Sequence, residues 1–431
     1  MLVVVVLVLG VLTVVMLRAG GTILFPPALF CASWFATLAG AAAAGARFLP
    51  ISEYASLIYL VGSVAFVLGG TVVLYYLGDA PKGDVAPMRR SEATRHALDA
   101  LLILLVAAYP YYFHIALRIA GTSNPALFLP AIRMRMVQVA GNPFGVAGNL
   151  NVLAALVASA MVYESDGSVK RRLKAVVAVI MALGYGVLTG SKGVVLLLVT
   201  LFFLTQIRAG RVRPVAVFAA AGIVLATFTV GLWAINFHGR SFSNIGAMAS
   251  RMASMGGNYW LSSVVTFSRI VTKPNSLPSA ESIGRFFLQT SKSLGFHVRV
   301  PSINPKFTVF GTHGENSNTY TIYFSYFKEY GWFGSIVLLA GLGGGLTLVW
   351  RRAMAARPVA ILFYAGFCTA IMQSIQSENF FLGLNWDVKA LIVYGFLYWM
   401  LPRYFPRQWR RQGAAAPVPC PGSAMHAVGR Q

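Results

Sequence analysis

The chain has 431 residues, of which 57% are hydrophobic and only 11% are charged, and its mean hydropathy is +0.68. Soluble domains contain about 25% charged residues, so this composition excludes an ordinary soluble globular protein. Runs of about 20 apolar residues recur along the chain, and a run of that length crosses the hydrocarbon layer as an α-helix. A membrane β-barrel would alternate apolar and polar residues, which these runs do not.

In chain order, these runs predict eleven membrane-spanning helices in an all-α polytopic membrane protein. Eight spans fall within residues 1–235, at 2–17, 23–46, 55–77, 97–117, 144–163, 174–190, 193–207 and 214–235. Three more fall within residues 320–402, at 320–350, 358–376 and 386–402. The first run lacks a basic start and a clear cleavage site, so we interpret it as a span rather than a removed signal peptide.

Residues 236–319 between the two groups are predicted to form one large loop, and residues 403–431 a cytoplasmic tail. The tail is rich in Ala, Pro and Gly after Gln412, which predicts disorder. Two apolar stretches of the loop, Tyr259–Phe267 and Ser282–Leu288, are typical of short amphipathic helices at the membrane interface. The glycines Gly341 and Gly343–Gly345 predict close helix packing.

Basic residues in the short loops set the orientation, because such loops remain in the cytoplasm. With eleven spans, they all fall on one side: Arg89, Arg90, Lys170–Lys174, Arg208, Arg211, Arg213, Arg351, Arg352, Arg357, Arg403, Arg407, Arg410 and Arg411. The net charge of +23 is therefore explained largely by topology and anionic-lipid contact, without nucleic acid. The large loop then lies on the opposite, outer face.

The large loop is itself strongly basic, and orientation does not explain that charge, because long exported loops carry charge regardless of topology. Between Asn236 and Lys328, a range that includes the start of the next span, the basic residues are Arg240, Arg251, Arg269, Lys273, Arg285, Lys292, Arg299, Lys306 and Lys328. An excess of this kind favours an anionic ligand, and the planar fork of Arg suits a phosphate. Contact with anionic lipid headgroups is the alternative explanation.

The end of the loop concentrates polar side chains with catalytic potential. His313 and Glu315 are general-base candidates, and the amides of Asn316 and Asn318 suit sugar hydroxyls. Tyr320 begins a run of tyrosines that could stack on sugars, although an interfacial aromatic belt explains most of them. The sequence contains no nucleotide-binding fingerprint and no tight metal-ligand spacing, so we expect no metal or cofactor. An outer-face enzyme would need an already activated substrate.

Three motifs resemble those of the bacterial O-antigen polymerase and O-antigen ligase superfamily. The stretch His313–Tyr320, continuing to Glu329–Gly334, resembles the end of the large periplasmic loop in that superfamily. Thr189–Gly193 resembles its T-G-S-R-G hairpin, with Lys192 in place of the usual Arg, and Gly148–Asn151 resembles a third feature.

The resemblance implies a metal-independent glycosyltransferase with a GT-C-like fold in the bacterial inner membrane. Such an enzyme polymerises undecaprenyl-diphosphate-linked oligosaccharide repeat units at the periplasmic face. Its partners would be this lipid-linked donor, membrane lipids, a chain-length regulator and a repeat-unit flippase. The implied diphosphate ligands are Arg240, Arg251 and Lys192.

In that reaction His313 or Glu315 would orient or deprotonate the acceptor, while Asn316 and Asn318 hold sugar hydroxyls. Two alternatives stay open. A ligase that transfers the finished glycan to a lipid A core or a protein would have nearly the same topology and chemistry. A lipid-linked sugar flippase or other transporter would be expected to show internal repeats and charges deep within spans. We find no repeat of the first half in the second.

Overall fold

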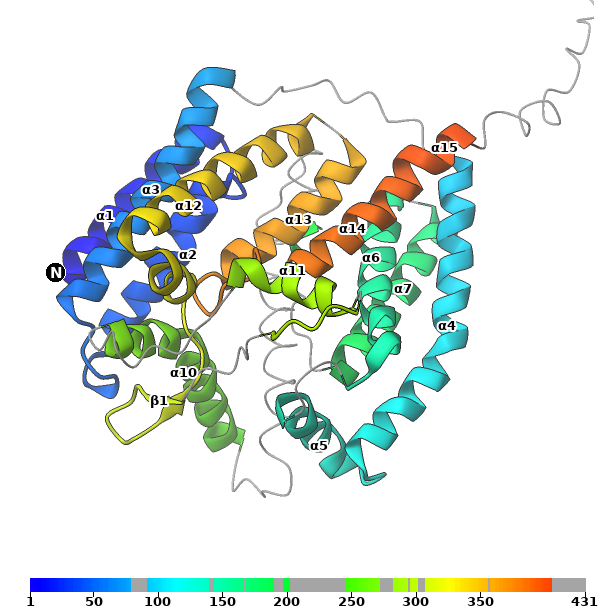
Figure 1. Ribbon diagram of the computed structural model, residues 1–431, viewed down its shortest axis with the longest axis horizontal. Helices are drawn as coiled ribbons and strands as arrows, with labels where there is room; N and C mark the ends of the chain where they lie inside the picture. Colours follow the sequence, from blue (N-terminus) through cyan, green and yellow to red (C-terminus); the bar gives the residue numbers. More distant parts are fainter. Residues whose placement is uncertain are drawn as a thin grey trace, which may run out of the picture.

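The computed structural model describes residues 1–78, 91–138, 143–165, 168–189, 197–201, 245–271, 282–293, 295–300, 307–355 and 357–404. These residues are mostly α-helical, in agreement with the predicted all-α membrane protein (Figure 1). Among them, seven helices are long and apolar enough to cross a membrane: Leu2–Gly20, Pro26–Ala43, Glu53–Leu77, Glu92–Ala120, Gly145–Glu164, Val169–Thr189 and Ile322–Met354.

Each of these seven helices overlaps one predicted span, and two further predicted spans are also helical. The prediction 358–376 corresponds to α13 (Pro358–Gln373), which has 16 residues. The prediction 386–402 corresponds to α14 (Leu384–Gly395), a π-helical turn at Phe396–Met400 and α15 (Leu401–Tyr404). Of the prediction 193–207, the helical residues 197–201 are described, and 214–235 lies outside the described residues.

The N-terminal half of the bundle is built on α1 (Leu2–Gly20), α2 (Pro26–Ala43) and α3 (Glu53–Leu77). Helix α2 begins at Pro26 and Pro27, where proline suits the first helical turn because no intrahelical N–H bond is lost there. Ser52 caps α3 by accepting a hydrogen bond from the Ala55 backbone N–H at 3.2 Å. Helix α12 (Ile322–Met354) packs against α3, although the two are far apart in sequence.

Close approach of α3 and α12 requires glycine on both helices. A Cβ added to Gly343 would lie 2.0 Å from the Phe66 carbonyl oxygen, and one added to Gly69 would lie 1.9 Å from that of Ala340. The prediction of close packing is therefore confirmed at Gly343. It is wrong at Gly341 and Gly345, where an added Cβ would meet nothing within 4 Å.

The second half of the bundle contains α4 (Glu92–Ala120), α5 (Pro125–Gln138), α6 (Asn149–Glu164), α7 (Val169–Thr189) and the α14–α15 segment. The short 3-10 turn η2 (Gly145–Gly148) leads into α6. The Thr94 hydroxyl on α4 donates to the Leu397 carbonyl at 2.7 Å, inside the π-helical turn. This hydrogen bond joins α4 to the segment between α14 and α15.

The basic helix ends gather at one end of the bundle. Arg351 Nη2 donates to the Leu77 carbonyl at 2.6 Å, which joins the ends of α12 and α3. Arg95 lies 3.7 Å from Glu164, joining the start of α4 to the end of α6. Figure 1 shows α15 at this end and α5, α10 and β1 at the other. The end carrying α10 and β1 is thus opposite the end where these basic helix ends lie.

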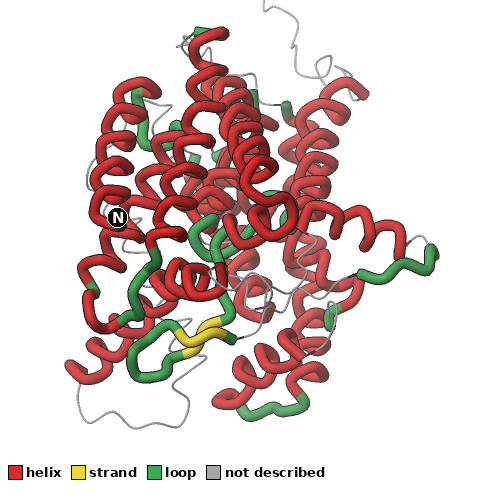
Figure 2. Tube along the Cα trace, turned by 60° about the vertical axis from the view of Figure 1, so that its left-hand side comes forward, coloured by secondary structure: helices red, strands yellow, loops and turns green. Residues whose placement is uncertain are grey.

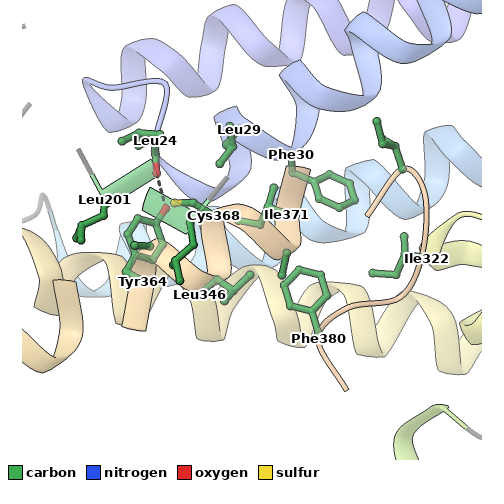
Figure 3. Packing of buried hydrophobic residues seen from close by; sticks show 14 of the residues in the cluster. Leu24, Leu29, Phe30, Leu201, Ile322, Leu346, Tyr364, Cys368, Ile371 and Phe380 are labelled. Carbon is green, nitrogen blue, oxygen red and sulfur yellow. Dashed lines mark hydrogen bonds between the residues drawn. The ribbon is translucent and has the colours of Figure 1, made fainter. Parts of the chain in front are cut away.

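Side chains from both terminal regions form a shared apolar core. Figure 3 shows Phe30 of α2, Leu346 of α12 and Cys368 of α13 within one cluster, and all three are buried. The Tyr364 hydroxyl donates to the Leu24 carbonyl, so a buried polar group on α13 is satisfied by the turn before α2. Helices α2 and α13, from opposite ends of the sequence, are therefore packed together rather than forming separate units.

The region predicted as a large loop contains two helices and a hairpin. Helix α10 (Ile245–Val271) packs against α2 and α3, with Ser262–Ser268 buried. The stretch Tyr259–Phe267, predicted as a short interfacial helix, is thus part of a longer helix whose last half is buried in the protein. Helix α11 (Ser282–Ser293) covers the second predicted stretch. The strands β1 (Thr308–Val309) and β2 (Asn316–Ser317) follow, shown in yellow in Figure 2.

Candidate functional site

The polar stretch around His313 forms a β-hairpin that is anchored to a distant segment of the chain. Strands β1 and β2 pair antiparallel, with Thr308 opposite Ser317 and Val309 opposite Asn316. The hairpin also pairs with the connection between α2 and α3, because the Leu49 N–H donates to the Phe310 carbonyl at 2.9 Å. A bridge between Phe48 and Gly311 continues this pairing.

A set of hydroxyl groups fixes the other side of the hairpin to α10. Ser262 Oγ donates to Ser317 Oγ at 3.1 Å, and Thr266 Oγ1 donates to the Thr319 carbonyl at 2.6 Å. The small Ser and Thr side chains of α10 let the hairpin approach the helix closely and still satisfy buried polar atoms. The hairpin therefore sits on a rigid base of helix α10.

Tyr320 has a packing role at the base of the hairpin. Its hydroxyl lies 2.8 Å from Thr308 Oγ1, and its ring stacks on Phe324 with centroids 4.6 Å apart. Only 5% of the side chain is exposed. Burial raises the pKa of the Tyr320 hydroxyl, and the hydrogen bond with Thr308 partly opposes that shift. Because the Tyr320 ring is buried against Phe324, it has no exposed face on which a sugar could stack as predicted.

The Glu315 carboxylate is engaged in holding the hairpin turn. Its Oε2 accepts a hydrogen bond from the His313 backbone N–H at 3.1 Å. It also lies over Gly311, where an added Cβ would be 2.0 Å from Oε2. Gly314 has a φ of 83°, a backbone conformation that favours glycine. The tight turn is therefore specified by Gly314 and Glu315 together. These contacts favour a structural function for Glu315.

His313 and Arg47 are the exposed ionisable residues that the hairpin brings together. The Thr312 N–H and hydroxyl both contact the Arg47 carbonyl, at 3.2 and 3.3 Å, so residue 47 is held next to the turn that carries His313. The Arg47 guanidinium lies 5.9 Å from the centroid of the Phe48 ring. Asn316 is exposed on β2, and Asn318 is half-buried.

Arg47 is not among the site residues predicted from the sequence. It belongs to the short connection between α2 and α3, and no local motif marks it. Its relation to His313 depends on pairing between segments about 265 residues apart, which a single sequence does not reveal. The predicted cations are placed differently: Lys192 and Arg240 lie outside the described residues, and Arg251 lies on α10 with its side chain outside the described part.

Helix α12 is interrupted close to the hairpin. Gly331 has φ 62° and ψ −160°, which divides the helix into a short outer piece and a long piece. The Trp332 indole N–H donates to the Tyr54 hydroxyl at 3.0 Å, which fixes the break against the first turn of α3. The G-x-x-G feature of Gly331–Gly334 therefore coincides with this break. Irregular backbone at membrane depth is tolerated where protein or a water-filled cavity surrounds it.

Glu378 is a buried acidic residue in the connection between α13 and α14. Only 2% of the residue is exposed, and its carboxylate accepts hydrogen bonds from the Tyr326 hydroxyl and from the backbone N–H groups of Phe380, Phe381 and Leu382. Burial raises the pKa of Glu378, and these hydrogen bonds partly oppose the shift. The carboxylate thus folds the connection between the two helices, which favours capping over substrate binding.

Within the described residues, no group of three or more His, Cys, Asp or Glu side chains is placed to hold a metal ion. No known family model, curated protein or solved structure matches this chain. The site has to be interpreted from its own geometry and from the sequence motifs.

Proposed function

We propose that the protein is a membrane-embedded, metal-independent glycosyltransferase that polymerises undecaprenyl-diphosphate-linked oligosaccharide repeat units. The active site is the hairpin surface around His313, at the periplasmic face of the bacterial inner membrane. In this proposal the bundle has eleven spans and a GT-C-like arrangement. The observation that supports it most directly is an exposed His313 held beside Arg47 at the end of the bundle opposite the basic helix ends.

The proposed reaction uses the diphosphate of the donor lipid as the leaving group. An acceptor sugar hydroxyl attacks the anomeric carbon, and the bond from that carbon to the diphosphate oxygen breaks with its electron pair on the oxygen. His313 takes the hydroxyl proton, a step typically worth about 10²–10⁴ in rate. Arg47, together with Arg240, Arg251 and Lys192, stabilises the negative charge that develops on the departing diphosphate.

The hairpin architecture suits this proposal because it holds the reacting groups on packed elements. The Ser and Thr contacts with α10 and the pairing with residues 48–49 limit movement of the turn. Positioning of reactive groups contributes strongly to catalysis. Asn316 and Asn318, on the second strand and directly after it, provide amide donors and acceptors for sugar hydroxyls.

The polysaccharide profile of a gene-deletion strain tests the proposed function. A polymerase predicts single repeat units on the lipid A core, restored to a full ladder by the wild-type gene and not by His313→Ala. Accumulation of free lipid-linked polymer would instead assign the ligase reaction. Loss of all outer-face intermediates would assign a flippase and overturn the transferase proposal.

A further inference from the structure

A small cavity inside the bundle is lined by one carboxylate and otherwise mainly by carbon. It lies between α6, α13, α14 and residues 197–201, and its walls include Leu156, Leu362, Phe363, Trp386 and Tyr394. Asp387, in the first turn of α14, contributes the carboxylate. The cavity volume of about 10 Å³ is close to the space that one water molecule requires.

The Asp387 carboxylate has no hydrogen bond or ion pair within the described part of the chain. Glu378 contrasts with it, because four donors surround that carboxylate. Asp387 is half-buried, and removing an ionised carboxylate from water without such donors is costly, whereas the neutral acid is tolerated and can donate its own O–H. These surroundings therefore favour the protonated form of Asp387.

The charged groups around Asp387 do not offset an ionised carboxylate. Glu378, in the connection between α13 and α14, is the neighbouring charged group that acts on Asp387. Lys389 on the same helix donates to Asn149 Oδ1 at 2.7 Å. The cavity walls from α6, α13 and residues 197–201 are Leu156, Leu362, Phe363, Gly366 and Leu197, which carry no titratable group.

We propose that Asp387 is a reversible proton-binding site inside the membrane bundle, exchanging its proton through a water molecule in the cavity. On release, the carboxyl O–H bond breaks, its electron pair stays on the carboxylate oxygen, and the proton passes to the water. A metal cation would need several oxygen ligands, and this lining supplies one carboxylate among carbon atoms. The first-turn N–H groups of α14 moderate the cost of the charged form, so both forms are accessible.

Tyr394 gives the cavity a second polar wall. The residue is 1% exposed, and its hydroxyl makes no hydrogen bond to the described residues within normal hydrogen-bond geometry. A water between Asp387 and this hydroxyl would have partners at both ends. The proposal is independent of the glycosyltransferase assignment, because it concerns proton binding alone.

Infrared difference spectroscopy of the purified full-length protein tests the proposal directly. A neutral carboxylic acid has a carbonyl stretch that is separate from the carboxylate and amide bands. We expect a band that is present at neutral pH, decreases at alkaline pH and returns on acidification. It should be absent from Asp387→Asn, which mimics the neutral acid, and retained in the control Asp99→Asn, whose carboxylate is paired with Lys174 at 2.5 Å.

Asp387→Glu keeps a titratable acid and provides a second readout, in which the band shifts in frequency and persists. This variant keeps the test valid if Asp387→Asn cannot be purified as a folded protein. Identical carboxylic-acid bands in the wild type and Asp387→Asn at every pH would overturn the site. A band that depends on Asp387 but never responds to pH would overturn reversible exchange. Polysaccharide polymerisation does not enter either readout, so failure here leaves the proposed function intact.

Discussion

The backbone N–H of His313 donates to the Glu315 carboxylate at 3.1 Å, so the two predicted catalytic residues are coupled through the turn and not through their side chains. The Glu315 carboxylate is occupied by the backbone, while the His313 side chain is exposed. The arrangement separates a residue that shapes the turn from a residue that is free to meet a substrate.

His313→Ala is expected to reduce polymerisation strongly, with little effect on folding. Removing a general base typically lowers the rate by about 10²–10⁴, and the exposed ring contributes little to packing. The measurements are the polysaccharide ladder of the complemented strain and the thermal unfolding of the purified variant. An unchanged ladder would remove His313 from the reaction.

Glu315→Ala is expected to affect stability more than activity, the reverse of His313→Ala. Loss of a hydrogen-bond acceptor in the turn costs about 1 kcal/mol, which should lower the unfolding temperature and reduce activity only partly. Glu315→Gln keeps one acceptor oxygen and serves as the matched control, with a smaller effect on stability. If Glu315→Ala has wild-type stability and no activity, Glu315 acts as the base instead.

Arg47→Ala is expected to weaken use of the lipid-diphosphate donor by roughly tenfold or more, because a charge-assisted contact to phosphate contributes about 1.5–3 kcal/mol. Arg47→Lys should retain part of the activity through its charge. Arg118, an exposed arginine in the last turn of α4 at the same end of the bundle, provides the control variant Arg118→Ala. Equal activity of Arg47→Ala and Arg118→Ala would place Arg47 outside the site.

Glu378 predicts a specific pH dependence of stability. Its pKa in the folded protein is raised by burial, so its contribution to folding is fully present below the unfolded-state value and is lost as the pH rises through the folded value. We therefore expect the wild type to lose stability relative to Glu378→Gln as the pH is raised from about 4.5 toward neutrality. Paired unfolding measurements across this range would show parallel curves if the carboxylate did not titrate.

Gly343→Ala is expected to destabilise the contact between α3 and α12. The new Cβ would meet the Phe66 carbonyl oxygen at 2.0 Å, and overpacking of this kind costs about 1–3 kcal/mol. Gly345→Ala is the matched control two residues away, because its Cβ would meet nothing within 4 Å. Thermal unfolding in detergent should lower the transition temperature for Gly343→Ala alone. The packing argument fails if the two variants unfold at the same temperature.

Apolar run length was sufficient to predict the long helices, because any backbone in lipid must satisfy its own hydrogen bonds. The same criterion missed the burial of Ser262–Ser268 on α10, since a face rich in Ser and Thr has the composition of a solvent-exposed loop. The Ser262 and Thr266 hydroxyls among them are hydrogen-bonded to Ser317 and Thr319 of the hairpin segment. Hydropathy cannot detect hydroxyl groups that satisfy one another across a contact.

The sequence pointed to the hairpin segment as a candidate site, but residue types alone did not separate catalytic residues from residues that shape the turn. A short segment with His313, Glu315 and Asn316 has the residue types of a catalytic centre, and the same segment, with Gly314 at φ 83°, also specifies a tight turn. Only the folded structure distinguishes a residue that shapes the turn from a residue whose side chain is exposed. Arg47 was missed because its proximity depends on strand pairing between distant segments, and no local pattern marks that pairing.

The pairing of Thr312 with Arg47 also imposes an order on biosynthesis. The two residues are 265 positions apart, so the connection between α2 and α3 is synthesised long before its partner. The hairpin can take its final form only after α10 and that connection are both in place. A chain that stalls or inserts incorrectly after α7 would therefore present Arg47 without His313. Such a chain would present the connection between α2 and α3 without the hairpin that pairs with it.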